Sequence, residues 1–227
     1  MRLRKKPNLP ARIEKCAHLL VTEPESLRGR WLDEYGRDEL HIELGCGRGR
    51  FTVETAKASP EKLFVALEKT LSAMIIAVER ADKEILHNIR FINALADNLA
   101  EYFLPGEASR IYINFCDPWP ANRHAKRRLT HRRFLELYKH ILRPQGEVCF
   151  KTDDLALFDF SLREFEHCGF SPVDLTRDLH KDGPVGIMTD YEIKFHSQGL
   201  PIYNAQFHTN RPRAFPVSSK NDDSNDY

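Results

Sequence analysis

The sequence lacks several features that would assign it to a class at once. Its five cysteines form no CxxC pair or other metal-ligand spacing, and it contains neither a signal peptide nor a long apolar run. The cysteine pattern argues against a metal site, and the missing apolar run argues against a membrane-spanning helix. We therefore expect a reduced, cytoplasmic protein with no metal and no membrane partner.

The chain also lacks a net charge of one sign, since 34 Lys and Arg residues nearly balance 33 Asp and Glu residues. A nucleic-acid partner must therefore be argued from where the charges lie. Six bases and no acid lie between positions 118 and 135, and a second basic cluster, RLRKK, occupies residues 2–6. The last seven residues, NDDSNDY, are acidic, and we expect this tail to be disordered.

Short apolar runs alternate along the chain with segments of helical spacing. The runs expected to form strands are residues 41–44, 63–68, 89–93, 110–115 and 147–152. The expected helices cover residues 51–58, 70–85, 97–103, 131–142 and 155–169, and residues 170–176 and 203–209 are expected as closing strands, antiparallel at the sheet edge. This alternation predicts an open α/β fold, a doubly wound and mostly parallel sheet whose ligands bind at the carboxyl ends of the strands.

A glycine loop, residues 45–49 (GCGRG), follows the first expected strand and opens the first helix. Its glycines let the backbone turn sharply and approach a nucleotide-like ligand. A dinucleotide fingerprint would need a small residue where Arg50 stands. Glu43 ends the strand before the loop, where a carboxylate would repel a pyrophosphate but suits the sulfonium and amino group of S-adenosylmethionine. The loop therefore favours S-adenosylmethionine over NAD.

Glu68 ends the second strand, where a carboxylate can accept hydrogen bonds from both hydroxyls of an adenosine ribose. Because NAD and S-adenosylmethionine both carry this ribose, Glu68 does not separate them. The segment after the third strand should pass the adenine edge, and Asn93, Asp97 or backbone groups can read the base there.

The stretch INFCDPWPANRHAKRR, residues 113–128, passes from apolar to acidic and aromatic and then to basic. Asp117 follows the fourth strand at the ligand edge of the sheet and is the best catalytic candidate. Pro118 and Pro120 restrict the backbone around Trp119, whose ring offers a surface for a flat base. The bases that follow can contact the phosphates of a polyanion.

Taken together, these blocks resemble the bacterial tRNA (guanine-N(7)-)-methyltransferase family, from residue 2 to about residue 209. The motifs that carry the resemblance are IELGCGRGRF, ALEK, YINFCDPWP with RHAKRRL, FKTDD, and IMTDYEIKF followed by GLPIY. The resemblance implies a Rossmann-like class I S-adenosylmethionine-dependent methyltransferase that acts on a guanine in the tRNA variable loop, as a monomer or homodimer. Its methyltransferase domain would span residues 37–210, between a basic arm and helix at 1–36 and the acidic tail at 211–227.

The resemblance also implies roles for individual residues. Contacts to the methyl donor are implied for Glu43, Gly45, Gly47, Glu68, Asn93, Leu95 and Asp117. Asp117 is implied as the catalytic acid. Contacts to guanine or tRNA are implied for Ala121, Arg123, His124, Lys126, Arg127, Arg128, Asp153, Thr189, Asp190, Tyr191 and Glu192.

The chain departs from the family pattern at two of these positions. Many members have an acid where Leu95 stands, so the adenine contact here falls to Asn93 or to backbone groups. Members commonly have a lysine where Ala121 stands, and Arg123 is the expected substitute.

Guanine N7 has an in-plane lone pair and no proton, so its methylation needs no strong general base. The enzyme must mainly hold nitrogen, methyl carbon and sulfur in line, and such positioning contributes roughly 7 to 11 kcal/mol. Asp117 would orient the base and favour the positive charge that moves onto it. Donors near O6 would be Arg or backbone groups, and Asp153 or Glu192 can accept from the amino and imino groups.

Three other functions remain open at this stage. A methyltransferase of exocyclic amino groups would show N/D-P-P-Y/F/W, and this chain is one proline short. An NAD-dependent oxidoreductase would need a small residue at position 50. A non-catalytic RNA-binding module would leave the glycine loop and both strand-end acids unexplained.

Overall fold

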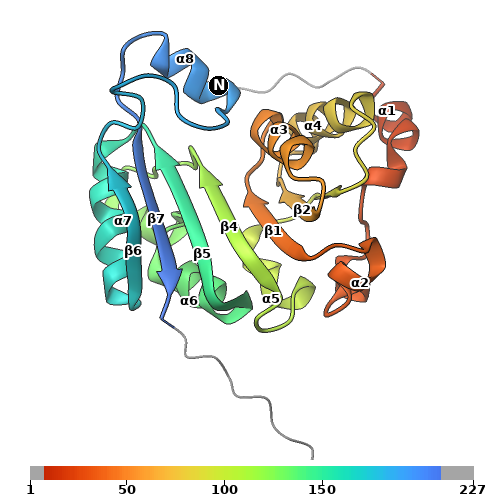
Figure 1. Ribbon diagram of the computed structural model, residues 1–227, viewed down its shortest axis with the longest axis horizontal. Helices are drawn as coiled ribbons and strands as arrows, with labels where there is room; N and C mark the ends of the chain where they lie inside the picture. Colours follow the sequence, from red (N-terminus) through yellow and green to blue (C-terminus); the bar gives the residue numbers. More distant parts are fainter. Residues whose placement is uncertain (1–7, 211–227) are drawn as a thin grey trace, which may run out of the picture.

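In the computed structural model, which describes residues 8–210, seven strands form one sheet in the order β3-β2-β1-β4-β5-β7-β6 (Figure 1). The strands are β1 Glu39–Leu44, β2 Lys62–Leu67, β3 Ile89–Ile92, β4 Ala108–Asn114, β5 Leu142–Thr152, β6 Phe170–Thr176 and β7 Tyr203–Thr209. The basic cluster at residues 2–6 and the acidic tail at residues 211–227 lie outside the described residues.

The pairing of the strands confirms the predicted fold class. β1 to β5 run parallel, whereas β7 lies antiparallel between β5 and β6. The two closing strands thus pair antiparallel at one side of the sheet, as expected, with β6 at that edge and β3 at the other. β5 also begins five residues earlier than expected, directly after the preceding helix, and its register with β4 shifts between Ala108 and Arg110.

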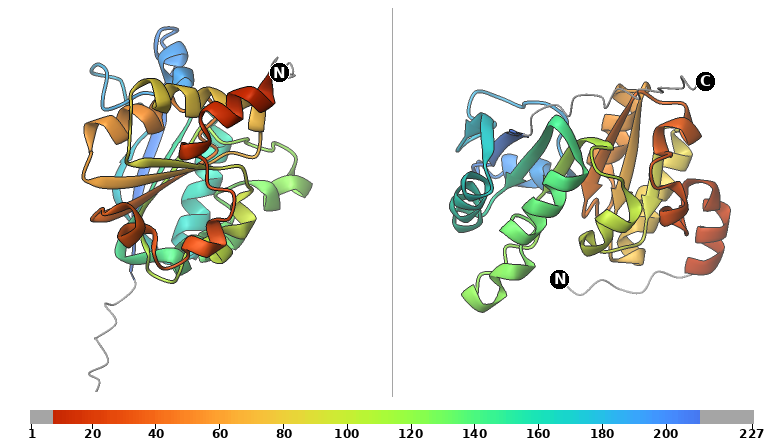
Figure 2. Two further views of the ribbon diagram at one scale, coloured as in Figure 1. Left: turned by 90° about the vertical axis from the view of Figure 1, so that its right-hand side faces the viewer. Right: turned by 90° about the horizontal axis from the view of Figure 1, so that it is seen from below.

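Helices cover both faces of the sheet (Figure 2). They are α1 Leu9–Lys15, α2 Trp31–Tyr35, α3 Arg50–Ala58, α4 Leu71–Lys83, α5 Leu99–Tyr102, α6 Arg132–Ile141, α7 Leu155–His167 and α8 Asp190–His196, with short 3-10 helices at Ala17–Leu19, Pro24–Leu27, Ala96–Asn98 and Asn122–Arg127. Buried side chains recur every three or four residues, as at Phe134, Tyr138 and Ile141 of α6. This helical period packs one stripe of each helix on the sheet.

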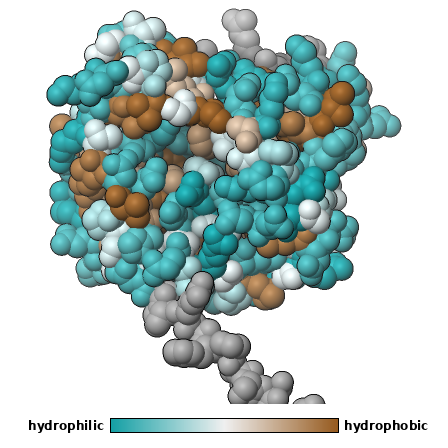
Figure 3. Space-filling model, in the orientation of Figure 1, coloured by the Kyte–Doolittle hydropathy of each residue, from teal (hydrophilic) through white to brown (hydrophobic). Residues whose placement is uncertain are grey.

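The two apolar layers lie on opposite faces of the sheet, because alternate residues of each strand point to opposite sides. Ile42 and Val65 belong to the cluster that contains α6 and α7, whereas Phe64 and Ala66 belong to the one that contains α3 and α4. The face shown in Figure 3 is mostly hydrophilic and carries several separate apolar patches. Val173 and Leu175 of the edge strand β6 are among the exposed apolar side chains.

The segment before β1 packs against the β3 side of the sheet. Leu20 forms a parallel bridge with Phe91 of β3. Trp31 is fully buried, and its indole N–H donates to the Tyr102 carbonyl at 2.9 Å. The described part of the expected N-terminal segment is therefore continuous with the core of the domain.

Gly49 sets how closely α3 approaches α4. Its φ is +72°, and a Cβ at this position would lie 2.3 Å from the Ala77 Cβ. We expect Gly49→Ala to lower the free energy of unfolding by about 2–3 kcal/mol, because it adds left-handed strain to overpacking. Urea unfolding measures this loss, with Gly36→Ala as the matched control, since Gly36 has φ +57° and no atom within 4 Å of its added Cβ. Equal losses in the two variants would refute the packing role.

Candidate active site

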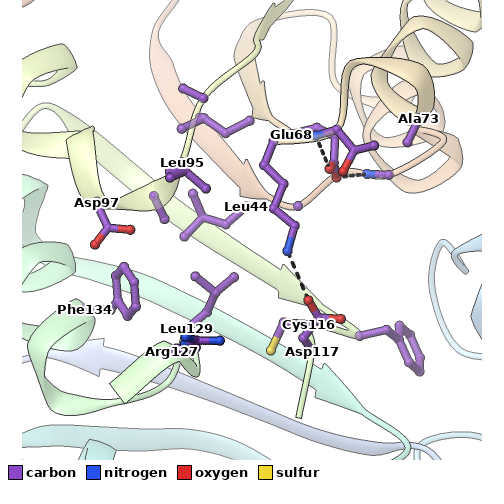
Figure 4. A pocket seen from close by; sticks show the side chains of 18 of the residues that line it. Leu44, Glu68, Ala73, Leu95, Asp97, Cys116, Asp117, Arg127, Leu129 and Phe134 are labelled. Atoms are coloured by element: carbon purple, nitrogen blue, oxygen red, sulfur yellow. Dashed lines mark hydrogen bonds and ion pairs between the residues drawn. The ribbon is translucent and has the colours of Figure 1, made fainter. Parts of the chain in front are cut away.

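A pocket of about 750 Å³ lies at the carboxyl ends of β1, β2 and β4 (Figure 4). Strands β1 and β2 and the turns that follow them contribute Gly45, Gly47, Glu68 and Lys69 to its wall. The segment after β4 contributes Asp117 to the same wall. The order of the strands, in which β1 and β4 are neighbours, brings these two sets together, as expected at the switch point of such a sheet.

The glycine loop presents bare backbone to this pocket. Gly45 and Gly47 have φ values of +77° and +56°, and a Cβ added at either position would meet no atom within 4 Å. A side chain there would fill the open pocket and hold a ligand away from the backbone. The loop thus forms a cradle of the kind that a nucleoside ligand requires.

Glu68 braces the loop from the neighbouring strand. Its Oε2 accepts a hydrogen bond from the Gly47 N–H at 3.0 Å, and its Oε1 accepts one from the Thr70 N–H at 2.8 Å (Figure 4). The Asn93 side chain donates to the Glu68 carbonyl at 2.7 Å, which ties β3 to β2. Because a carboxylate accepts about four hydrogen bonds, Glu68 keeps capacity for a ligand in the pocket.

Glu43 lies beneath the loop and does not line the pocket. Its carboxylate accepts hydrogen bonds from the Thr52 hydroxyl and, at 2.9 Å, from the Asn114 amide. Burial raises the pKa of Glu43, although both hydrogen bonds oppose this effect. The structure therefore gives Glu43 a bracing position between β1, α3 and β4, and its predicted contact to the donor stays a prediction.

Asp117 stands on a constrained turn after β4. Phe115 and Trp119 on either side of it adopt positive φ values of 52° and 42°. This is uncommon for aromatic residues and indicates that the surrounding structure fixes the turn. The Asp117 carboxylate is 65% exposed and lies 3.1 Å from the Lys69 ammonium, so it is accessible to a ligand (Figure 4).

Cys116 lines the pocket beside Asp117 and is the one thiol close to the catalytic candidate among the described pocket residues. Burial raises its pKa to about 12, and the Asp117 carboxylate adds to the shift. The thiol is therefore protonated at neutral pH and is not a nucleophile.

The residues after Trp119 that were expected to contact RNA differ in their exposure to solvent. Ala121, Arg123, Lys126 and Arg127 are exposed, and the Arg127 guanidinium lies over the Trp119 ring at 4.9 Å. Trp119 also meets His124 edge to face, with ring centroids 5.7 Å apart.

Arg128 is buried instead. Its guanidinium donates to the carbonyls of Pro118 and Trp119 at 2.9 and 3.0 Å. In this arrangement Arg128 supports the turn that carries Asp117, and its predicted contact to RNA remains untested.

Helix α8 carries the TDYE motif to the same edge of the sheet, above β4 and β5 (Figure 1). Thr189 and Glu192 form a capping box at its start. Glu192 is fully buried, where it accepts from Lys151 at 3.0 Å and lies 2.8 Å from His180 Nε2. These contacts fix the helix on β5.

Asp190 and Tyr191, which lie between Thr189 and Glu192, contact different partners. Asp190 pairs with Arg80 of α4 at 2.9 Å, whereas Tyr191 lines the pocket with its ring 5.3 Å from Phe115. Burial raises the pKa of Tyr191, and the nearby Asp153 carboxylate adds to the shift. Asp153 directly follows β5 and does not line the pocket.

The pocket brings together nine of the residues singled out from the sequence: Gly45, Gly47, Glu68, Leu95, Asp97, Asp117, Trp119, Arg127 and Tyr191. The other predicted residues lie around it or beneath it. Sequence reasoning missed Lys69, Phe115 and Arg133 as pocket residues. Lys69 directly follows Glu68 in the ALEK motif, and Arg133 had been noted only as one of the bases in the run. Arg133 pairs with Asp97, and both residues line the pocket.

Two kinds of feature are absent from the part of the chain that the structure describes. Within residues 8–210, no group of three or more His, Cys, Asp and Glu side chains could hold a metal ion. No helix among those residues is long and apolar enough to cross a membrane.

Several solved structures that share this architecture are methyltransferases. A 16S rRNA methyltransferase superimposes with a TM-score of 0.61 at 15% identity, covering 92% of this chain and 97% of that one. A mutant 16S rRNA (adenine(1408)-N(1))-methyltransferase from Catenulisporales acidiphilia, with cosubstrate S-adenosylmethionine, has a TM-score of 0.57 at 17% identity and covers 81% and 93%. The fold is thus that of the class I S-adenosylmethionine-dependent methyltransferases.

Sequence comparison narrows this class. Residues 37–205 match a family model described as a putative methyltransferase. The chain is 43% identical over 208 residues to a tRNA (guanine-N(7)-)-methyltransferase of Bacillus cytotoxicus, covering 91% of this chain and 96% of that protein. The chain therefore belongs to the tRNA (guanine-N(7)-)-methyltransferase family, which confirms the resemblance found in the sequence.

Proposed function

We propose that this protein transfers the methyl group of S-adenosylmethionine to N7 of a guanine in the variable loop of tRNA. The observation that carries the proposal is one pocket with two unlike sides. A braced glycine loop and Glu68 form one side, and the exposed Asp117 carboxylate stands on the other. A cytoplasmic location, where tRNA is available, belongs to the same proposal, as does a monomeric or homodimeric state.

The residues on the first side fit the methyl donor. Bare backbone at Gly45 and Gly47 leaves room for the donor, and Glu68 can accept from its ribose hydroxyls. Leu95 is exposed within the pocket and offers an apolar surface to the adenine. When bound, S-adenosylmethionine supplies a methyl group activated by its sulfonium.

The residues on the second side fit a nucleotide of a polyanion. Asp117 would orient the guanine and stabilise the positive charge that develops on it. The aromatic rings of Trp119 and Tyr191 line the same pocket, where a splayed-out base can stack. Exposed Arg123, Lys126 and Arg127 continue outward from it and would contact phosphates.

The test is a product analysis. Purified protein is incubated with unmodified tRNA and methyl-labelled S-adenosylmethionine, and the RNA is digested to nucleosides. We expect the label in 7-methylguanosine, and nuclease mapping should place it in the variable loop. A tRNA whose variable-loop guanines are replaced by adenine is the control and should accept little label. Label in another nucleoside would disprove the guanine N7 target.

A further inference from the structure

Lys69 occupies a position in the pocket that none of the roles above uses. It follows Glu68 on the donor side, yet its ammonium lies 3.1 Å from Asp117 Oδ2 on the acceptor side (Figure 4). Its side chain is 55% exposed, so the group is open to a ligand that enters the pocket. An ammonium has three N–H bonds, and the ion pair uses one of them. The other two can be donated to a base.

The remaining cationic groups of the pocket are engaged elsewhere. Arg133 pairs with Asp97, and Arg127 lies over the Trp119 ring. Arg128, just outside the pocket, is held by the carbonyls of Pro118 and Trp119. Among the described pocket residues, Lys69 is therefore the cation placed directly beside the catalytic carboxylate.

The edge of guanine that carries N7 also carries O6, a hydrogen-bond acceptor. Adenine has an amino group in place of O6, and this group presents hydrogens to any donor that faces it. Lys and Arg are the usual side chains that donate to O6 of guanine. An ammonium placed near the reacting nitrogen thus favours guanine and disfavours adenine.

Electrostatics allow a lysine at this place. A free ammonium would repel the sulfonium of the donor and the positive charge that forms on the methylated base. Asp117 offsets that charge, because the two groups form an ion pair. The pair can then supply a donor for O6 without adding net charge beside the reaction.

We propose that Lys69 selects guanine at this site by donating a hydrogen bond to O6 of the acceptor base. This inference rests on the proposed function. It makes Lys69 a specificity-determining residue, whereas Asp117 orients the base and stabilises charge.

The test combines a change in the enzyme with a change in the base. Once the methylated guanine has been mapped, tRNA is assembled with 2-aminopurine at that position, which keeps N7 and the 2-amino group, replaces O6 by hydrogen and also lacks the N1 hydrogen. Because the N1 hydrogen is missing for both enzymes, its loss cancels when wild type and variant are compared on this RNA. Single-turnover kcat/KM is measured for wild type and Lys69→Met on both RNAs. We expect the wild type to lose about 10- to 100-fold on 2-aminopurine, and Lys69→Met to lose about the same on guanine.

The decisive measurement is the rate of Lys69→Met on the 2-aminopurine RNA, where both changes are present. Since both changes remove the same hydrogen bond, Lys69→Met should lose little further rate on 2-aminopurine. Lys69→Gln keeps an N–H donor and should retain part of the preference for guanine. Lys57→Met is the matched control, because Lys57 is 54% exposed and pairs with Glu84 on the surface, outside the pocket. Its rates should equal those of the wild type on both RNAs.

The outcomes separate the inference from the function on which it rests. If the wild type forms 7-methylguanosine but the two losses multiply, Lys69 acts only by supporting Asp117 and the inference is overturned. Full activity of Lys69→Met on guanine overturns it as well. If the wild type forms no 7-methylguanosine in tRNA, the proposed function fails first, and the role of Lys69 fails with it.

Discussion

Asp117→Ala is expected to lower the rate of methyl transfer about 1,000-fold while leaving the affinity for S-adenosylmethionine close to that of the wild type. The rate falls because guanine loses the group that orients its nitrogen toward the methyl carbon and that stabilises the developing charge. Donor affinity should persist, because the glycine loop and Glu68 lie on the other side of the pocket and make no hydrogen bond to Asp117. Single-turnover kinetics and equilibrium donor binding measure the two effects separately.

Asp159→Ala is the matched control for this variant. Asp159 is a surface acid of α7 that pairs with Arg177 at 2.8 Å, and it lies outside the pocket. Its removal costs about 0–1 kcal/mol of stability and should not change the rate. An Asp117→Ala enzyme with normal turnover would remove Asp117 from the mechanism. Asp117→Asn should recover part of the orienting effect but not the charge.

The second large effect is expected for Glu68→Ala, which should weaken S-adenosylmethionine binding about 100- to 1,000-fold. Two contributions combine. The ribose hydroxyls lose a charged acceptor, and the Gly47 N–H loses the carboxylate that holds the glycine loop in place. Isothermal titration with the donor alone measures the loss without any RNA.

Glu107→Ala controls for the general cost of removing a carboxylate that binds backbone. Glu107 accepts from the N–H groups of Leu104 and Gly29 at 2.7 and 3.1 Å, but it does not line the pocket. This variant should be less stable than the wild type and bind the donor equally well. If both variants lost donor affinity to the same extent, the loss would reflect global destabilisation, and the specific role of Glu68 would be wrong.

The sequence predicted the regular part of the fold because local patterns determine it. The apolar runs before Gly45 and Glu68 are strands buried on both faces, and such strands differ clearly from the helical stripes between them. The pattern failed where a tertiary contact decides the structure. The seven-residue α8 has little apolar periodicity, and its start is fixed by the capping box of Glu192 together with the distant partners Lys151 and His180.

The sequence predicted the residues of the site only as far as it predicted where the strands end. Residues that follow a strand fall at the ligand edge, which located Glu68, Asp117 and Asp153. The direction of each side chain depends on neighbours far along the chain, and the sequence does not reveal it. Glu43 turns toward Thr52 and Asn114, and Lys69 crosses to a residue 48 positions away.

The sheet order places β4 beside β1, so the two sides of the pocket belong to different halves of the chain. The half that contains β1 to β3 provides the glycine loop and Glu68, whereas the turn after β4 and helix α8 provide Asp117 and Tyr191. Substitutions in the turn after β4 or in α8 therefore alter the acceptor side of the pocket without changing the glycine loop, and Lys69 is the exception because it reaches Asp117 from the donor side. On the roles proposed above, a new acceptor would require changes after β4 together with a change at Lys69, which follows β2.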